Sequence, residues 1–314
     1  MEVITTTSLS EAPLKAREKS RDIYLIAEET LLVIYTDRLE AHDVAMREPI
    51  PYKGVMHNQI TNFWMSKFAH FVGNYRITSK LDDYPQLKTH KDMLAGRSLL
   101  GRDLKRLPMR FLVVGGLGGN LWKEYQETGR LNGHYMVKGL EESEWMEQPV
   151  VVPLPRVDAS QSGGDGRKWA QRLLGQKLYA QIEERCLAVF GVARNYAAAR
   201  GLTLADTSLD FGMAGHTPLL MHELLTPDTS TYWPGDILPG ESKTNYERQN
   251  LYGWLRIQRW QPDQPQPDLP QQLLQETLKK YKFIYEVMTG KVATLKQQEA
   301  EEDAAAEVCS EEEE

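Results

Sequence analysis

The chain has 314 residues, of which 41% are hydrophobic and 26% are charged, and its formal net charge is −7. This composition is typical of a folded globular protein, and the absence of any apolar run of 18 residues argues against a membrane span. The first residues lack the basic and apolar regions of a secretory signal peptide, and Cys186 and Cys309 are the only cysteines. We therefore expect a cytoplasmic protein without a structural disulfide or a thiolate metal site.

The acidic residues are concentrated at the C-terminal end. Residues 299–314 hold nine of the 44 Asp and Glu residues and no Lys or Arg, so basic residues slightly outnumber acidic ones in the rest of the chain. A run of like charges repels itself and stays solvated, which predicts a disordered acidic tail over 298–314. Elsewhere the basic residues are scattered among acidic ones, and we expect no nucleic-acid partner.

The first elements are β-rich. Two short runs, 21–26 and 31–35, are separated by Ala27-Glu28-Glu29 and predict a β-hairpin. Residues 36–54, with several Pro, Asp and Gly, predict a loop. Apolar side chains at helical spacing then predict a helix over 58–71.

A glycine-rich segment follows the next apolar strand. Residues 110–114 predict this strand, 115–119 are four glycines around one leucine, and 121–128 predict a helix that ends at Gly129. Glycines let backbone N–H groups approach a phosphate, and a helix N-terminus favours an anion. The spacing matches neither a P-loop nor a dinucleotide fingerprint, so a plain strand-to-helix turn is the favoured reading.

The second half carries the longest predicted helix. Residues 153–167 predict a long surface loop, and 169–200 predict a helix with one apolar stripe, stopped by Gly201. Residues 202–211 and 219–225 predict paired strands around a turn.

The chain then passes through a linker into a last helix. Residues 261–270 are too rich in proline for a regular element, and 273–288 predict an amphipathic helix closed by Gly290. Antiparallel strand pairs interspersed with helices predict an α+β fold.

The predicted strand pair of 202–225 is the best candidate active site. Side chains alternate along a strand, so Asp206, Ser208 and Asp210 share one face, whereas His222 and Glu223 point to opposite faces of the partner strand. Carboxylates that converge from two strands repel one another unless a cation lies between them, and nucleotide-bound Mg²⁺ is the usual cation. A solvated polar face remains the alternative.

Two other segments could bind phosphate. Lys19-Ser20-Arg21-Asp22 lies at the start of the first hairpin, where a lysine could hold phosphates as a point charge or could simply be exposed. Residues 225–233 combine several hydroxyls with Asp228 after an apolar strand, which fits either an anion cradle or a capped turn.

Taken in chain order, these segments resemble the SAICAR synthetases, purine-pathway ligases that join aspartate to a carboxyaminoimidazole ribotide with ATP. The resemblance runs from about residue 15 to residue 291. It is carried by Lys19-Ser20-Arg21-Asp22-Ile23-Tyr24, Thr36-Asp37-Arg38, Pro51-Tyr52-Lys53-Gly54, Arg97-Ser98-Leu99-Leu100, Trp122-Lys123-Glu124-Tyr125, Ala205-Asp206-Thr207, Glu223-Leu224-Leu225-Thr226-Pro227-Asp228 and Gly240-Glu241-Ser242.

The resemblance implies a two-lobed α+β fold with a nucleotide cleft between the lobes. It implies a β-rich N-terminal nucleotide-binding lobe over 1–110, an α/β substrate lobe over 111–297 and ATP with Mg²⁺ as cofactors. Small-molecule carboxylate and amine substrates, no membrane and a homo-oligomer are further implications.

The implied site residues fall into four groups. These are Lys123, Asp210 and Glu223 for catalysis; Lys19, Ser20, Arg21, Asp210 and Glu223 for the nucleotide; Asp210 and Glu223 for the metal; and Asp43, Asn120, Asp228, Ser230 and Arg248 for the substrates.

Several residues depart from the family's motifs at the expected site. Ser208 and Asp210 stand where the family has Lys and Glu, His222 where it has Asp, and Thr231 and Tyr252 where it has arginines. An arginine binds phosphate through a planar set of donors that Thr cannot supply. We therefore expect a diverged ATP-dependent, amide-forming ligase acting on a non-standard substrate. A non-catalytic binding descendant and a genuine SAICAR synthetase are the alternatives.

Overall fold

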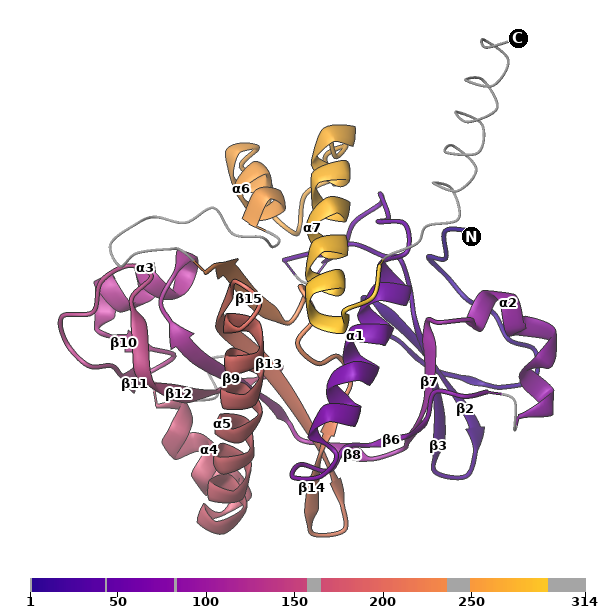
Figure 1. Cartoon of the computed structure of the whole chain (residues 1–314), viewed down its shortest axis with the longest axis horizontal. Coiled ribbons are helices and arrows are strands. Elements are labelled where there is room, and N and C mark those ends of the chain that lie inside the picture. Colours follow the sequence, from indigo (N-terminus) through magenta and orange to yellow (C-terminus); the bar gives the residue numbers. More distant parts are fainter. Residues whose placement is uncertain (1, 43, 82–83, 157–164, 236–248, 293–314) are drawn as a thin grey trace.

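The computed structural model describes residues 2–42, 44–81, 84–156, 165–235 and 249–292. Two lobes, each built on a β-sheet, flank a pair of central helices, α1 (Lys53–Phe68) and α7 (Gln271–Thr289) (Figure 1). The predicted acidic tail and the Gly240-Glu241-Ser242 motif lie outside the described residues.

The N-terminal lobe contains a five-stranded antiparallel sheet in the order β1-β2-β3-β7-β6. Its strands are β1 (Leu14–Arg17), β2 (Arg21–Ala27), β3 (Thr30–Tyr35), β6 (Arg76–Thr78) and β7 (Ser98–Arg102). Val33 and Tyr35 face the main core with α1, whereas Leu32 and Ile34 pack beneath the short helices η1 (Pro85–His90) and α2 (Lys91–Leu94). The β2–β3 pair confirms the predicted hairpin.

The second lobe is built on a six-stranded sheet in which β12, β9, β13 and β14 are neighbours and β8 and β15 also pair with β13. Its strands are β8 (Lys105–Arg106), β9 (Met109–Gly116), β12 (Trp145–Pro155), β13 (Leu202–Ala214), β14 (Thr217–Met221) and β15 (Ser230–Pro234). The helices beside it are α3 (Gly119–Thr128), α4 (Gly166–Leu174) and α5 (Gln176–Ala198), whereas α6 (Gln249–Ile257) packs against α7. Two small hairpins complete the chain: β4 (Glu40–Ala41) pairs with β5 (Val44–Ala45), and β10 (Arg130–Leu131) pairs with β11 (His134–Tyr135).

Several predicted boundaries differ from the structure, including the helix predicted over 58–71, which is observed as α1 over Lys53–Phe68. The helix predicted over 169–200 is broken at Gly175, whose φ of 81° separates α4 from α5. The segment predicted as a loop over 153–167 includes the end of β12. The strand predicted over 219–225 ends at Met221, because His222 has a φ of 56° and the left-handed backbone takes the chain out of the sheet. The prediction that His222 and Glu223 belong to the strand is therefore wrong: both lie beyond its end.

The two lobes share one hydrophobic core. Backbone hydrogen bonds join Tyr75 and Gly73 to Leu220, at 2.9 and 3.0 Å, and link the N-terminal lobe to β14. Helix α7 packs along α1, where the Tyr285 hydroxyl donates to Gln59 Oε1 at 2.8 Å. The chain changes from one sheet to the other between β7 and β8, so the boundary predicted after residue 110 falls inside β9.

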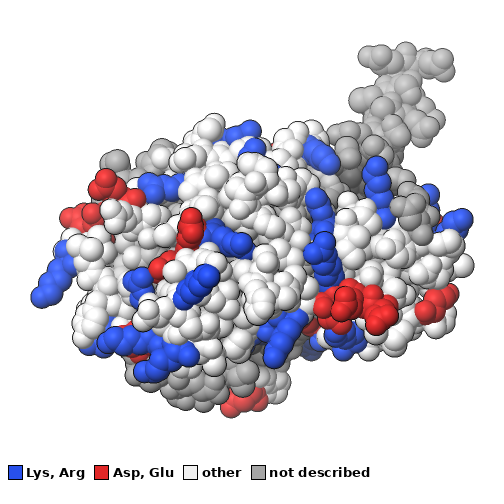
Figure 2. Space-filling view, turned by 90° about the horizontal axis from the view of Figure 1, so that it is seen from below, with Lys and Arg blue, Asp and Glu red and all other residues white. Residues whose placement is uncertain are grey.

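Within the described part of the chain, no helix combines the length and apolar character needed to cross a bilayer. Figure 2 shows one face of the molecule, where Lys and Arg are dispersed between uncharged residues and Asp and Glu occur on the same face.

Candidate active site

A cleft of about 1490 Å³ lies between the lobes. Its walls come from the β1–β2 connection, the outer face of β13, the start of α3, the segments after β14 and the α6 region. Among the residues that line it are Glu18, Lys19, Ser20, Arg21, Arg106, Asn120, Lys123, Arg156, Asp206, Ser208, Asp210, His222, Glu223, Asp228, Ser230, Thr231, Tyr252 and Arg256.

The structure brings most of the predicted site residues to this cleft. The face shared by Asp206, Ser208 and Asp210 is confirmed, since all three are half-buried between buried neighbours and line the cleft. Asn120 and Lys123 are exposed on α3 at the opposite wall. Asp43 and Arg248 lie outside the described residues, so their predicted role stays a prediction.

The predicted nucleotide residues differ in burial. Lys19 is half-exposed, with its Nζ 3.7 Å from Glu40 Oε1. Ser20 and Arg21 are buried, and both face the Glu223 carboxylate: the Ser20 hydroxyl donates to Oε2 at 3.4 Å and the Arg21 guanidinium lies 3.7 Å from the same oxygen. These two residues therefore reach Glu223 across the boundary between the lobes.

Glu223 is enclosed by polar partners. Its Oε1 lies 2.7 Å from His57 Nδ1 and accepts a hydrogen bond from the Thr226 hydroxyl at 2.7 Å. Burial alone would raise the pKa of this carboxyl, but the imidazole of His57 and the charge of Arg21 lower it to about 2. Glu223 is therefore a fixed negative charge at neutral pH.

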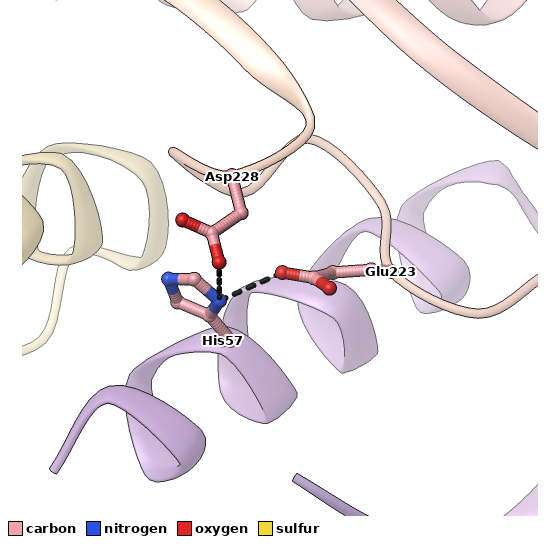
Figure 3. Close-up of side chains that lie close together, drawn as sticks. All are labelled: His57, Glu223 and Asp228. Carbon is pink, nitrogen blue, oxygen red and sulfur yellow. Dashed lines mark ion pairs between the residues drawn. The ribbon is translucent and has the colours of Figure 1, made fainter. Parts of the chain in front are cut away.

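His57 connects Glu223 to a second buried carboxylate (Figure 3). Its Nδ1 lies 3.8 Å from Asp228 Oδ2, and this oxygen is 2.7 Å from Nζ of Lys53, a side chain with no solvent exposure. The Tyr281 hydroxyl of α7 donates to Asp228 Oδ1 at 2.6 Å. We call Lys53, His57, Glu223 and Asp228 the inner cluster.

Donor atoms of His57, Glu223 and Asp228 all lie within 4.8 Å of one another, a spacing that could hold a metal ion. However, the ammonium of Lys53 already supplies the cation beside Asp228, and an added divalent ion would be repelled by it.

The sequence did not predict His57 or Lys53 as site residues. Both occur in α1, and the polar positions of this helix give no sign that they face carboxylates far along the chain.

A second group of titratable residues faces the cleft, and we call it the arginine group: Glu18, Arg106, His222, Asp210 and Arg156. The Glu18 carboxylate lies 2.7 Å from Arg21 and 2.9 Å from Arg106. Burial opposes its ionisation, but the charges of Arg21 and Arg106 hold the pKa of Glu18 well below the ordinary value. Glu18 was not among the predicted site residues, although it directly precedes the predicted segment Lys19-Ser20-Arg21.

Arg106 also contacts His222. The guanidinium donates to His222 Nε2, and burial together with the charges of Arg21 and Arg106 holds the pKa of His222 well below the ordinary value. The imidazole is therefore neutral at neutral pH and acts as an acceptor for Arg106.

Asp210 is paired in the same way. Its Oδ1 lies 2.5 Å from Arg156, whose Nε donates to the Leu107 carbonyl at 3.0 Å. The predicted magnesium site would need oxygens of Asp210 and Glu223 directed at one ion. In this arrangement each carboxylate is engaged by cationic or hydroxyl groups of the protein, so the pair does not fit a magnesium ion held by both.

Glycines at the end of β9 and just after it make room for aromatic rings. A Cβ on Gly115 would lie 2.6 Å from the Phe190 ring, and one on Gly118 would lie 2.7 Å from the Trp233 ring. Packing therefore explains Gly115 and Gly118, although Gly118, Gly119 and Asn120 also line the cleft at the start of α3.

The hydroxyl-rich segment is a turn that bonds to itself before β15. Thr229 donates its backbone N–H to the Thr226 carbonyl at 3.1 Å, and Thr226 donates its own N–H to the Thr229 hydroxyl at 3.2 Å. Ser230 is buried and shares a 2.7 Å hydrogen bond with Thr207. The turn thus holds Asp228 in the inner cluster.

Comparison with known proteins decides the family. The model of the SAICAR synthetase family matches residues 14–267. The chain belongs to the SAICAR synthetase family. Members of this family are ATP-dependent ligases, and the predicted family and α+β fold are confirmed.

The similarity covers nearly the whole of both chains. The phosphoribosylaminoimidazole-succinocarboxamide synthases of Maridesulfovibrio salexigens and Thermodesulfovibrio yellowstonii are 36% and 33% identical, over 91% and 92% of this chain and 97% and 99% of theirs. A solved SAICAR synthase superposes with a TM-score of 0.83, and the Saccharomyces cerevisiae enzyme complexed with SAICAR with 0.80; each is 32% identical and covers 93% of this chain and 100% of its own.

Proposed function

We propose that the chain is an ATP-dependent ligase that forms an amide between a carboxylate and an amine in the interlobe cleft. The observation that carries this proposal is the meeting of Ser20 and Arg21 with Glu223 at the cleft floor, in a family of ATP-dependent ligases. The cytoplasmic location and the homo-oligomer expected from the sequence remain predictions.

The reaction has two steps. The carboxylate takes the γ-phosphoryl group of ATP on one oxygen and releases ADP. The amine nitrogen then attacks the acyl carbon, the C–O bond to phosphate breaks, and the nitrogen loses a proton as the amide forms. The acyl phosphate makes this second step feasible, because phosphate leaves far more readily than oxide.

We assign the nucleotide and the substrates to different walls of the cleft. Lys19, Ser20 and Arg21 contact the nucleotide, since they form the edge of the N-terminal lobe that lines the cleft. Asn120 and Lys123 on α3 contact the substrates, and Lys123 is the exposed cation nearest the start of that helix. Asp228 and Ser230 shape the cleft from the turn before β15, while Asp210 and Glu223 hold the arginines in place.

The first substrate pair to test is aspartate with the carboxyaminoimidazole ribotide, because the relatives carry the name of that reaction and one is a complex with SAICAR. The residues Thr231 and Tyr252 instead favour a substrate pair that lacks the ribotide phosphate. Both line the cleft where the family's motifs have arginines, and each lost charge-assisted contact to a phosphate weakens binding by about 1.5–3 kcal/mol.

ADP release should be measured with the ribotide and aspartate and then with a panel of other carboxylates and amines. We expect ADP and amide to form in equal amounts with at least one pair of carboxylate and amine. We expect Lys123→Ala to slow that reaction at least tenfold. Lys138→Ala, an exposed lysine outside the cleft lining, is the matched control. Binding of ATP without ADP formation for any pair would instead support the non-catalytic alternative.

A further inference from the structure

Four carboxylates of the cleft and its floor are each paired with a cationic or imidazole group of the protein. Glu18 is paired with Arg21 and Arg106, Asp210 with Arg156, Asp228 with Lys53 and Glu223 with His57. A magnesium ion needs such oxygens for itself, because it is bound through one or two carboxylates in addition to phosphate and water. The positions that a metal would use are therefore already neutralised by side chains.

The same pairing places guanidinium groups where a phosphate chain can reach them. Arg106 and Arg156 line the cleft with 26% and 23% of their side chains exposed, so both can meet a ligand without unfolding. Arg156 is held by the Leu107 carbonyl and Arg106 by the neutral ring of His222. A guanidinium carries five N–H donors, so each can keep its protein partner and still donate to a phosphate.

His222 makes a magnesium ion unfavourable at this place in the cleft. Mg²⁺ prefers oxygen ligands and binds the nitrogen of a neutral imidazole poorly. In addition, Nε2 of His222 already accepts a hydrogen bond from Arg106. A metal at this position would also lie against the charge of Arg106.

We propose that Arg106 and Arg156 bind the phosphates of the nucleotide directly, and that a divalent cation is not needed for this binding. The inference rests on the proposed function only in taking the ligand to be ATP. The arginines supply the positive charge that neutralises the phosphates, and Glu18 and Asp210 hold these arginines in the orientation seen in the cleft.

The test is titration calorimetry of the full chain with ATP in EDTA and again in excess MgCl₂. We expect the dissociation constant in EDTA to be equal to, or below, the value in MgCl₂. Binding that is tenfold or more tighter with Mg²⁺ would overturn the inference and leave the proposed function standing. Failure to bind in both conditions would overturn both.

Two variants identify the residues responsible. Arg156→Gln and Arg106→Gln should each weaken ATP binding in EDTA at least tenfold, with circular dichroism as the check on folding. Arg194→Gln is the control, since Arg194 stacks on Trp145 at 3.7 Å, away from the cleft lining. If Arg106→Gln fails to fold, Arg156→Gln carries the test, and unchanged binding in that variant would contradict the proposal.

A double variant tests the reason for metal independence. Arg106→Leu with His222→Asp removes a guanidinium and supplies a carboxylate at a position whose φ of 56° Asp tolerates. We expect this protein to bind ATP at least tenfold more tightly with Mg²⁺ than in EDTA. Equal binding in both conditions would show that Arg106 and His222 do not determine the metal dependence.

Discussion

The inner cluster and the arginine group contain the same kinds of charged residue, but they differ in exposure. Lys53 and His57 have at most 1% of their side chains exposed, whereas Arg106, Arg156, Glu18 and Asp210 have 20–26%. A fully buried charge without its partner is costly, whereas a charge with about a quarter of its side chain exposed to the cleft is partly solvated by water. We therefore expect the inner cluster to contribute most to stability, and the four partly exposed members of the arginine group, Glu18, Arg106, Asp210 and Arg156, to determine binding.

The largest expected effect tests the buried side of this comparison. Lys53→Ala leaves the buried Asp228 carboxylate without its ammonium partner, which should lower the free energy of unfolding by about 3–5 kcal/mol. Urea denaturation measures the loss. Lys168→Ala is the control, because its pair with Asp165 is exposed and should contribute less than about 1 kcal/mol. Equal losses in the two variants would remove the distinction drawn from burial.

Glu223 gives the inner cluster an acid dependence. Its pKa is lowered from 4.5 to about 2, so its ionised form stabilises the fold above pH 4.5, and this stabilisation is lost as the pH falls toward 2. The loss should approach about 3 kcal/mol. Glu223→Gln should remove this part of the pH dependence of urea unfolding, whereas exposed Glu147→Gln should retain it. A wild-type curve that is flat between pH 4.5 and 2 would contradict the assignment.

His222 should give the arginine group a dependence at higher pH. Its pKa is lowered below 6.5, so the unfolded chain binds a proton that the folded one does not, and stability falls as the pH drops below 6.5. We expect the free energy of unfolding to fall as the pH is lowered from 6.5 to 5. We expect His222→Asn, which suits the positive φ, to flatten this interval, with His216→Asn as the exposed control. A slope unchanged by His222→Asn would assign the effect to other groups.

The smallest effect on stability is expected at Arg156. Its pair with Asp210 is about four-fifths buried on each side, yet it opens to the cleft, so Arg156→Gln should change the free energy of unfolding by no more than about 1 kcal/mol. The same variant should nevertheless weaken ATP binding at least tenfold. A large loss of stability measured in urea would place Arg156 with the inner cluster instead.

The sequence predicts the regular elements better than the contacts between them. Alternation along β13 correctly placed Asp206, Ser208 and Asp210 on one face, because strand geometry alone fixes that pattern. The predicted strand continued to residue 225, whereas β14 ends at Met221. The residue types in 219–225 give no indication of the left-handed backbone at His222.

The charge pairs of the cleft depend on tertiary structure. His57 meets Glu223, and Arg156 meets Asp210, only after the helices and the two sheets have been placed. Residue spacing carries no information on such pairs, and the family resemblance directed attention to Asp210 and Glu223 rather than to their partners. Glu18 was missed as well, although it directly precedes the predicted segment Lys19-Ser20-Arg21.

Helix α7 has a consequence for the order of folding. It completes the core beside α1, and the Tyr285–Gln59 hydrogen bond joins residues 226 positions apart. Loop closure over such a distance is slow compared with forming local hairpins. A chain emerging from the ribosome can therefore pair β2 with β3 early, but it cannot bring Tyr281 to Asp228 until α7 has been synthesised. The inner cluster is completed among the last steps of synthesis, so a chain released early would carry buried charges without their full set of partners and would be exposed to proteolysis.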